Sequence, residues 1–354
     1  MKALIAPALG RLELGDVAVP PIRPGQVLIR TQVSAVSAGT EKRKLYTAEL
    51  GPNDVRDQWP VIGGFGYMLS GTIEALGAGV SGLDIGQRVY AGRTWGAHRE
   101  LVDTDATSVV PLPDGLSAVD GACAYWAVPP LLGLLAVEPA LFDDAVVVGL
   151  GPIGLMAVQL LARLCRRVVA IDPIAARGAL AIGLGAAAFV PATDRPVERV
   201  RAVLPDGAHV VLEVSGTQPG LETALAVVRP KGRVGLVGSQ QRLDRFDLFW
   251  PLQHSGARIV PLHREGTASP QAGGIGNPTQ LWVPVAQELL MRGWLRVEPL
   301  ISWVVPPELA PRAMDLLHRR PDLAVGMAVA WDGSQVRNVE AFERAWSDGG
   351  EGSG

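Results

Sequence analysis

The sequence contains little cysteine and no large excess of either charge. Only Cys123 and Cys165 occur among 354 residues, too few for a disulfide framework or a cysteine-rich structural zinc site. The 32 lysines and arginines nearly balance the 35 aspartates and glutamates, which leaves a formal net charge of −3. This balance gives no electrostatic case for binding nucleic acid or an anionic membrane surface. We therefore expect a small-molecule substrate rather than a nucleic-acid or membrane partner.

The sequence also lacks an uninterrupted apolar run long enough to span a membrane. The longest candidate is DDAVVVGLGPIGLMAVQLLARL, and it is broken by glycines and a proline where a strand would turn into a helix. This favours a buried strand–helix unit over a membrane span. The first residues, MKALIAPALGRLEL, contain glycine, acid and arginine too early for a secretory signal. The expected location is the cytoplasm.

The pattern of apolar residues changes along the chain. Residues 1–122 contain short β segments separated by Gly, Pro and Asp, as in a compact β-rich domain. From 123 to 260, apolar strand segments alternate with amphipathic helices, which is typical of a parallel sheet covered on both faces. Residues 261–332 contain further helices and strands. Residues 333–354 form a C-terminal extension whose last residues, SDGGEGSG, are expected to be disordered. The predicted class is α/β with two domains.

The most specific local motif is VVVGLGPIG. Three of its glycines fit the pattern G-x-G-x-x-G, after a buried strand and at the start of a helix. In this pattern the first glycine permits a tight turn, the second lets a pyrophosphate approach, and the third lets the helix pack on the strand. Glycines also occur in such turns for packing alone, but the surrounding strand and helix favour a dinucleotide site. The residues predicted to hold the dinucleotide are Gly149, Gly151, Pro152, Ile153 and Gly154.

The next predicted strand, RVVAID, ends at Asp172. This is close to the ~20 residues downstream at which such sites carry a ribose-binding acid. A carboxylate there accepts hydrogen bonds from the ribose hydroxyls and repels a 2′-phosphate, which favours NAD(H) over NADP(H). Arg177 could instead swing towards a 2′-phosphate. A purely structural interpretation of Asp172 is a helix N-cap before Pro173.

Motifs along residues 1–332 resemble those of the medium-chain dehydrogenase/reductase superfamily. AVSAGTE (35–41) is similar to its G-I-C-G-T-D segment, and GFGYMLSGTIEALG (64–77) is similar to its G-H-E-x-x-G-x-V-x-x-V-G segment. DIGQRVYAG and GAHRELV resemble two further motifs. The resemblance implies a GroES-like, β-rich catalytic domain built from the first and third sections. It also implies a Rossmann domain, a doubly wound parallel sheet, built from the second.

The resemblance extends to the cofactor site and to a branch of the superfamily. EVSG and RVGLVGS stand where relatives contact adenosine and nicotinamide, which adds Ser215, Gly238 and Ser239 to the expected NAD(H) site. The segment SAVSAGTEKRKLYTAEL looks closest to a zinc-free branch that includes bacteriochlorophyllide hydroxyethyl dehydrogenases. Those enzymes oxidise a secondary alcohol on a large ring to a ketone. Relatives are commonly homodimers or homotetramers, so we expect a homo-oligomer.

Zinc-dependent relatives hold a catalytic Zn²⁺ with a cysteine in the first segment and with a histidine and a glutamate in the second. The resemblance places Ala38 at the cysteine position, Tyr67 at the histidine and Met68 at the glutamate. Alanine and methionine are not catalytic-zinc ligands, and phenolate ligation of zinc is uncommon. The four-cysteine structural-zinc lobe is missing as well. We therefore predict that the protein holds no zinc.

Without a metal, a protein group must exchange the proton with the substrate oxygen. Thr40 resembles in position the hydroxyl that relays this proton in zinc relatives. Tyr67 would project into the space of the missing metal, either as a proton donor or as an aromatic plug. His263 is a further ionisable candidate past the last Rossmann strand, although a solvated loop histidine is equally ordinary. His98 is expected to pack in the core.

The predicted function is a zinc-independent, NAD(H)-dependent interconversion of a secondary alcohol and a ketone. The substrate would be a secondary metabolite, a sugar or a cyclitol. One alternative is reduction of conjugated C=C bonds, as in zinc-free quinone and enoyl reductases. Asp172 speaks against it because that branch usually takes NADPH. Another alternative is a non-catalytic dinucleotide-binding protein on the same scaffold, against which the intact glycine loop and Thr40 argue.

Overall fold

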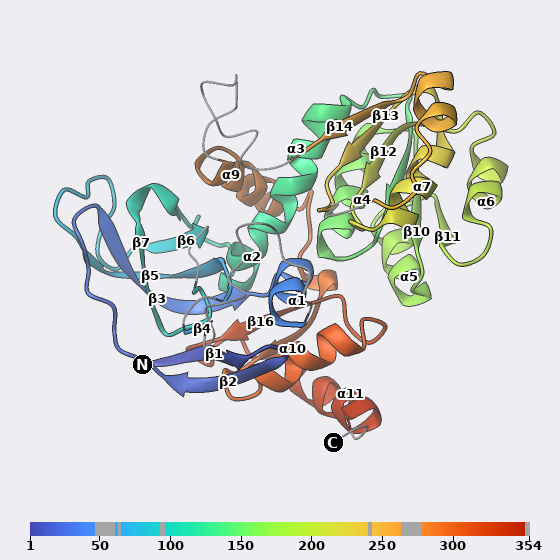
Figure 1. Ribbon diagram of the computed structural model, residues 1–354. Coiled ribbons are helices and arrows are strands. Elements are labelled where there is room, and N and C mark those ends of the chain that lie inside the picture. Colours follow the sequence, from blue (N-terminus) through green and yellow to red (C-terminus); the bar gives the residue numbers. More distant parts are fainter. Residues whose placement is uncertain (47–60, 63–64, 93–95, 240–242, 263–277, 351–354) are drawn as a thin grey trace. The chain divides into compact units, whose positions relative to one another are not determined.

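The chain divides into two compact units. The computed structural model describes residues 1–46, 61–62, 65–92, 96–239, 243–262 and 278–350 (Figure 1). The first unit comprises Met1–Tyr125, Thr279–Met291 and Val297–Gly354, and the second comprises Trp126–Pro278 and Arg292–Arg296. Each unit is therefore assembled from segments that are distant in the sequence.

The first unit is rich in β-structure, as predicted. Among the described residues, its larger sheet has seven strands in the order β15-β16-β3-β5-β6-β8, with β7 paired to β3, and a smaller sheet has the order β2-β1-β4. The strands are β1 (Lys2–Ala8), β2 (Arg11–Asp16), β3 (Gln26–Ala35), β4 (Val61–Ile62), β5 (Met68–Leu76), β6 (Arg88–Gly92), β7 (Leu101–Asp105), β8 (Val109–Pro111), β15 (Ile301–Val305) and β16 (Gly326–Ala330). The helices are α1 (Ala38–Tyr46), α2 (Ala118–Cys123), α9 (Pro278–Met291), α10 (Ala310–Arg319) and α11 (Val339–Gly350).

Strand β3 shows why this sequence forms a half-buried sheet. Val27 and Ile29 are fully buried, whereas Arg30 between the strand's apolar positions is exposed. This alternation is the period of two that a strand requires. The buried side chains pack against Leu69 and Ile73 of β5, which pairs with β3 in antiparallel register.

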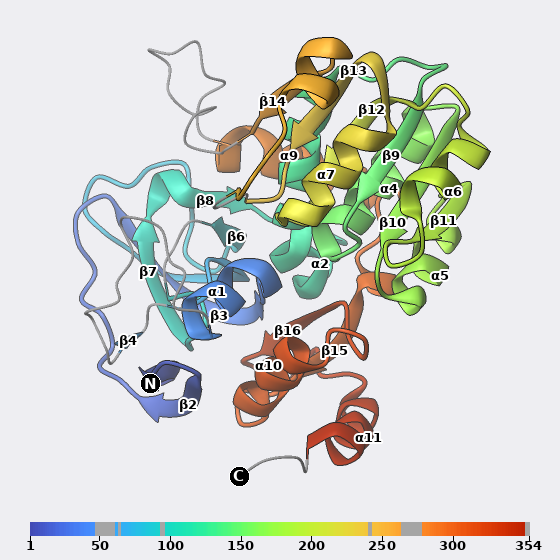
Figure 2. The ribbon, with the colours of Figure 1, turned by 45° about the vertical axis from the view of Figure 1, so that its right-hand side comes forward.

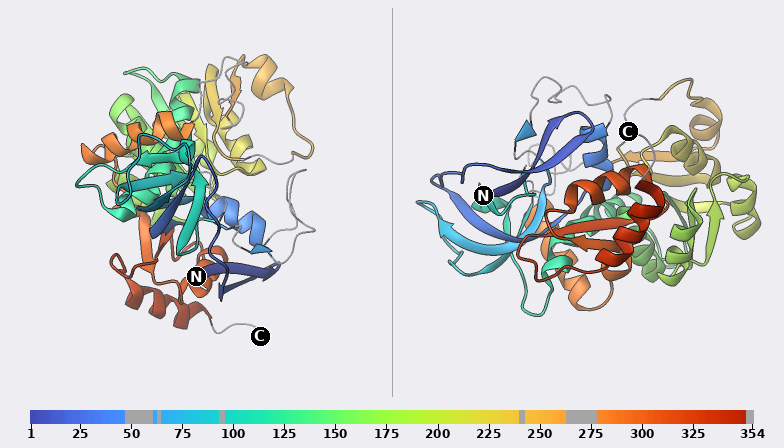
Figure 3. Two further views of the ribbon diagram at one scale, coloured as in Figure 1. Left: turned by 90° about the vertical axis from the view of Figure 1, so that its left-hand side faces the viewer. Right: turned by 90° about the horizontal axis from the view of Figure 1, so that it is seen from below.

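The C-terminal extension predicted for residues 333–354 contains helix α11. Phe342 is fully buried in the core of the first unit, and its ring centroid lies 5.5 Å from that of Trp303 on β15. Trp346 follows one helical turn further along. The guanidinium carbon of Arg312 lies over its indole, 4.6 Å from the centroid of the Trp346 ring. Disorder was expected from residue 347 onwards, but the helix continues to Gly350. Figure 3 shows α11 in red beside α10.

The second unit contains a parallel sheet. Among the described residues the sheet has six strands in the order β11-β10-β9-β12-β13-β14, and every neighbouring pair runs parallel. Helix α4 packs against β9 and β10, α5 packs against β10 and β11, and α7 packs against β9 and β12 (Figure 2). The strands are β9 (Asp144–Val148), β10 (Arg167–Asp172), β11 (Ala188–Pro191), β12 (Ala208–Glu213), β13 (Val228–Leu236) and β14 (Arg258–Pro261). The helices are α3 (Val128–Val137), α4 (Pro152–Leu164), α5 (Ala175–Gly183), α6 (Pro196–Val203) and α7 (Gln218–Val227), with a short π-helix η3 (Phe249–His254).

The long apolar stretch of the sequence is a buried strand–helix unit, as predicted. It divides into β9 and α4, and all five residues of β9 are buried. A different stretch, Ala118–Val137, is the one helical segment of the described residues that is long and apolar enough to cross a membrane. Because 78% of its apolar window is buried, it matches the core helix of a soluble protein.

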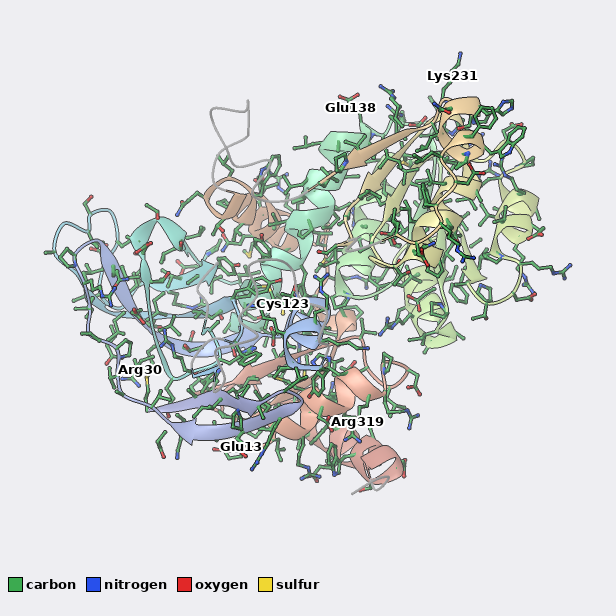
Figure 4. All side chains as sticks on the ribbon, in the orientation of Figure 1. Glu13, Arg30, Cys123, Glu138, Lys231 and Arg319 are labelled. Carbon is green, nitrogen blue, oxygen red and sulfur yellow. The ribbon has the colours of Figure 1, made fainter. Side chains whose placement is uncertain are left out.

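The two cysteines are not joined to each other. Both are free thiols; Cys123, labelled in Figure 4, lies in α2 and is fully buried, and Cys165 is partly buried. Burial raises the pKa of the Cys123 thiol well above its ordinary value and that of Cys165 to about 12. Neither thiol is therefore an effective nucleophile at neutral pH.

His318, near the end of α10, is a buried histidine that the sequence analysis did not single out. Its ring meets the ring of Tyr46 edge-on, with centroids 4.9 Å apart, and the residue is 6% exposed. Its Nε2 has no hydrogen-bond partner among the described residues. Burial lowers the pKa of His318 to about 4, against the opposing effect of the Glu41 carboxylate.

The stability of the protein should therefore fall as the pH is lowered from about 6.5 to about 4. Within this window the unfolded chain binds a proton at His318 that the folded protein does not. The loss amounts to about 3 kcal/mol for a shift of this size. His318→Phe keeps a ring against Tyr46 and should abolish this part of the pH dependence, measured by urea unfolding at both ends of the window. An identical pH dependence in the variant and the wild type would contradict the assignment.

Candidate active site

The glycine loop follows β9 directly and leads into α4. Gly149 has φ +95°, and a Cβ there would lie 2.7 Å from the backbone nitrogen of Ser215. A Cβ on Gly154 would overlap the carbonyl oxygen of Gly149. Gly151 is the N-cap residue of α4, and Pro152 is its first residue. The loop is therefore packed too closely for side chains at Gly149 and Gly154. The first N–H groups of α4 are left for an anion, because helix N-termini lack internal partners for them.

Asp172 fixes this loop from the end of β10. It is 4% exposed; its Oδ2 accepts the Leu150 N–H at 2.7 Å and its Oδ1 accepts the Ile174 N–H at 2.9 Å. The Nη1 of Arg177 lies 3.9 Å from the same Oδ2. The interpretation of Asp172 as a helix N-cap is wrong: α5 begins at Ala175 and has Ile174 as its N-cap residue. Each carboxylate oxygen retains a second lone pair, which can accept a hydrogen bond from a ligand hydroxyl.

Buried Glu213 organises the other predicted cofactor residues. Its side chain accepts the N–H of Ser215 at 2.8 Å and the N–H of Gly216 at 3.2 Å, and its backbone carbonyl accepts the N–H of Gly238 at 2.8 Å. Ser239 adjoins Gly216, where an added Cβ would lie 3.1 Å from the Ser239 nitrogen. Glu213 was missed by the sequence analysis, although an acid ending the apolar strand β12 was a usable signal.

These residues gather at one edge of the parallel sheet. The N–H groups of Val214 and Ser215 donate to the carbonyl of Val148, the last residue of β9, at 2.8 and 3.1 Å. The loops after β9, β10, β12 and β13 all leave the carboxyl ends of parallel strands. This is the edge where doubly wound sheets bind their ligands. The structure thus brings together Gly149, Gly151, Pro152, Ile153, Gly154, Asp172, Arg177, Ser215, Gly238 and Ser239.

A second group of polar residues lies in the first unit, around Tyr67. The Tyr67 hydroxyl is 2.7 Å from Oγ of Ser37, and its ring meets that of Tyr125 edge-on with centroids 6.1 Å apart. Burial raises the pKa of the Tyr67 phenol, whereas hydrogen bonds with Ser37 and Thr40 act in the opposite direction. The structure thus joins the predicted Thr40 and Tyr67, and it adds Ser37. His263 lies outside the described residues.

His98 is a core residue, as expected, but it is also part of a buried hydrogen-bonded pair. Its Nε2 lies 3.1 Å from Oε2 of Glu41, and the two side chains are 0% and 1% exposed. Gly66, immediately before Tyr67, has φ +75°, and a Cβ there would lie 2.8 Å from the His98 ring. Glycine at this position therefore lets the chain pass close against the imidazole. This contact explains one of the several glycines in the segment around Tyr67.

The positions of the zinc ligands in relatives do not fit a metal here. Ala38, the first residue of α1, has no ligand atom, and Met68 is fully buried in β5. The Tyr67 hydroxyl is already hydrogen-bonded to Ser37. Across the described part of the chain, no group of three or more His, Cys, Asp or Glu side chains could hold a metal ion.

A β-rich unit followed by a parallel sheet with a glycine loop after its β9 strand defines a two-unit dehydrogenase. Residues 23–124 match the model of the alcohol dehydrogenase GroES-like domain, and residues 152–263 match that of the zinc-binding dehydrogenases. The α/β class, with a GroES-like and a Rossmann-like domain, is therefore confirmed.

Comparison with individual proteins also finds dehydrogenases. The chain is 31% identical over 283 residues to an L-threonine 3-dehydrogenase of Mesorhizobium japonicum, covering 67% of this chain and 76% of that protein. It is 27% identical over 355 residues to a D-guloside 3-dehydrogenase of Escherichia coli, covering 94% and 100%. The structure of galactitol-1-phosphate dehydrogenase from Escherichia coli matches with a TM-score of 0.81 at 20% identity, covering 94% and 100%. The chain belongs to the zinc-type, NAD(P)-dependent medium-chain dehydrogenase/reductase superfamily, and it is an alcohol dehydrogenase-type oxidoreductase.

Proposed function

We propose that the protein is a zinc-independent, NAD(H)-dependent oxidoreductase that interconverts a secondary alcohol and a ketone. The observation that carries this proposal is the Tyr67 phenol, hydrogen-bonded to Ser37 and Thr40 beside a metal position without ligands. This arrangement supports the zinc-free branch of the superfamily. A sugar, cyclitol or related hydroxylated metabolite suits the relatives, whose names specify dehydrogenation at carbon 3 of a guloside and of threonine.

Bound NADH would supply the hydride that reduces the ketone carbon. Tyr67 would donate its phenolic proton to the ketone oxygen as that oxygen gains negative charge. Because burial raises the pKa of this phenol, Tyr67 stays protonated at neutral pH and suits donation better than abstraction. Thr40 and Ser37 would orient the phenol through their hydroxyls.

Asp172 supports the preference for NAD(H). Its carboxylate stands at the glycine loop, where it can accept hydrogen bonds from ribose hydroxyls and would repel a 2′-phosphate. Arg177, the side chain that could favour a 2′-phosphate, lies 3.9 Å from the same carboxylate. This ion pair partly neutralises the arginine. The homo-oligomeric state and the cytoplasmic location remain predictions.

A screen of substrates by nicotinamide absorbance tests the function. The purified protein should oxidise NADH in the presence of cyclic or sugar-derived ketones and reduce NAD⁺ in the presence of the matching alcohols. Enones tested alongside would reveal a C=C reductase. Binding of NADH without turnover of any carbonyl or alcohol would contradict an enzymatic function.

Metal analysis gives a separate prediction. The purified protein should contain no stoichiometric zinc, and its activity should survive exhaustive chelation, because Ala38 and Met68 offer no ligand for a catalytic metal. Elemental analysis before and after chelation, with turnover measured on the same samples, is the measurement. One tightly held zinc per chain, removed together with activity, would show that the zinc-free assignment is wrong.

A further inference from the structure

The backbone that carries Ser37 is held by a buried carboxylate. Ser37 precedes α1, and its N–H donates to Oε1 of Glu41 at 2.8 Å. In return, the Glu41 N–H donates to the carbonyl of Ser37 at 2.9 Å. This reciprocal pair fixes both the backbone and the position of Ser37, whose Oγ lies 2.7 Å from the Tyr67 hydroxyl.

Glu41 is held in turn by a chain of hydrogen bonds that runs into the interior of the first unit. Its Oε2 lies 3.1 Å from Nε2 of His98, and the Nδ1 of His98 lies 2.7 Å from Oγ of Ser34. The Trp331 Nε1–H donates to the same Ser34 oxygen at 2.8 Å. Ser34 and His98 are 0% and 1% exposed, so water does not compete for these bonds.

One placement of the hydrogens satisfies every group in this chain. Because Ser34 accepts from Trp331, its own hydroxyl hydrogen is available to His98 Nδ1, which then accepts. The other nitrogen, Nε2, carries the hydrogen and donates to the Glu41 carboxylate. The imidazole is then neutral, and Glu41 retains a full negative charge. A buried carboxylate is costly unless such donors hold it.

We propose that Glu41, held by His98, is a positioning residue for Tyr67. It fixes Ser37 against the phenol and places a negative charge beside it. The proposal rests on the proposed role of Tyr67 as a proton donor. Glu41 would act through Ser37 and through its field, without touching the substrate.

The electrostatics of Tyr67 agree with this geometry. Burial is the largest cause of the raised pKa of Tyr67, and the electrostatic interactions with Tyr125 and with the Glu41 carboxylate act in the same direction. The hydrogen bonds from Ser37 and Thr40 favour the phenolate and act against them. The other titratable groups that face Glu41 are His98 and, on α10, His318. The Glu41 charge therefore helps to keep the phenol protonated, and Ser37 sets its direction.

Removing the Glu41 charge and removing the Ser37 hydrogen bond should shift the pKa of Tyr67 in opposite directions. Glu41→Gln keeps the size of the side chain and an acceptor for the Ser37 N–H but removes the charge, so ionisation of Tyr67 should move to lower pH. Ser37→Ala removes a hydrogen bond that favours the phenolate, so ionisation should move to higher pH. Ser70→Ala is the matched control. Ser70 is fully buried and donates to the Ala118 carbonyl at 2.6 Å, so this variant loses a buried hydroxyl that is not bonded to Tyr67.

The measurement is a ¹⁹F NMR titration of protein in which tyrosine is replaced by 3,5-difluorotyrosine, whose phenol ionises at an accessible pH. The Tyr67 resonance is assigned by its loss in Tyr67→Phe. Unmoved ionisation in both Glu41→Gln and Ser37→Ala, or shifts equal to that of Ser70→Ala, would overturn the proposal. If Glu41→Gln fails to fold, the test rests on Ser37→Ala alone. An unchanged or lowered pKa of Tyr67 in that variant would overturn the proposal.

Kinetics separate this proposal from the proposed function. With a ketone that the wild type reduces, Glu41→Gln and Ser37→Ala should each lower kcat about 10-fold with little change in KM, as expected when proton transfer is misaligned. The pKa of Tyr67 could shift in opposite directions in the two variants while the wild type reduces no ketone. That result would support the positioning of Tyr67 and overturn the proposed function. Reduction by the wild type, with unmoved titrations in both variants, would overturn the positioning role alone.

Discussion

Replacement of Tyr67 by phenylalanine should lower kcat for ketone reduction about 10²–10⁴-fold and leave the affinity for NADH nearly unchanged. Phenylalanine keeps the ring that meets Tyr125 edge-on and deletes only the hydroxyl that Ser37 and Thr40 contact. The loss should therefore fall on proton donation rather than on the fold. Steady-state kinetics, fluorescence titration with NADH and a thermal melt of the same preparation measure the three quantities.

A plug at this position would behave differently. Tyr67→Phe would then be almost silent, and Tyr67→Ala would mainly destabilise the first unit. Thr40→Val is the companion variant, because it keeps the shape of the side chain while it removes the hydroxyl. Full activity in both Tyr67→Phe and Thr40→Val would show that neither residue handles the proton. His263 or a group on the substrate would then be the next candidate.

Asp172→Asn should raise the Kd for NADH about 10–100-fold and reduce the discrimination against NADPH. The substitution preserves the size of the side chain but removes the charge that accepts two backbone hydrogen bonds, from Leu150 and Ile174. The Leu150 bond holds the glycine loop, so the pyrophosphate-binding backbone should loosen together with the ribose contact. The nearby Arg177 would also lose its counter-charge and could serve a 2′-phosphate.

Titrations with both cofactors test this prediction. Asp194→Asn is a control in the same unit, because Asp194 is 48% exposed and its pair with Arg199 is a surface salt bridge of little energetic weight. An unchanged Kd in Asp172→Asn would show that Asp172 does not support the cofactor site. A wild-type preference for NADPH would overturn the assignment of NAD(H).

The parts of the fold that could be predicted are those with a local signal. The strand predicted as RVVAID is β10, residue for residue, because a continuous apolar run ends there at an acid and a proline. The glycine loop could be predicted because its residue types follow from close backbone packing. Helix α11 was not predicted, and its last residues, from Ser347, were expected to be disordered because their composition resembles a linker. Phe342 and Trp346 give it an apolar face that local composition did not reveal.

The group of polar residues around Tyr67 could be predicted only in part. Thr40 and Tyr67 stand at positions that the superfamily motifs mark. The pairing of Glu41 with His98 joins residues 57 positions apart, and neither residue type nor spacing indicates which partners will meet. His98 was correctly expected in the core, since an imidazole beside a glycine turn is consistent with packing. Its hydrogen bond with Ser34 could not be predicted, because it depends on the fold placing β3 next to His98.

The pairing of β3 with β16 has a consequence for how the chain is made. Ala35 lies opposite Ala328, so the ribosome must add roughly 290 residues before this part of β3 finds its neighbour. At about 5–20 residues per second, the interval is on the order of 15–60 s. All six described strands of the second unit's sheet have been made by then, so that unit can fold first, whereas the end of β3 still lacks its β16 partner in the nascent chain. During synthesis, this edge is therefore open to association with neighbouring nascent chains, against which a chaperone would protect it.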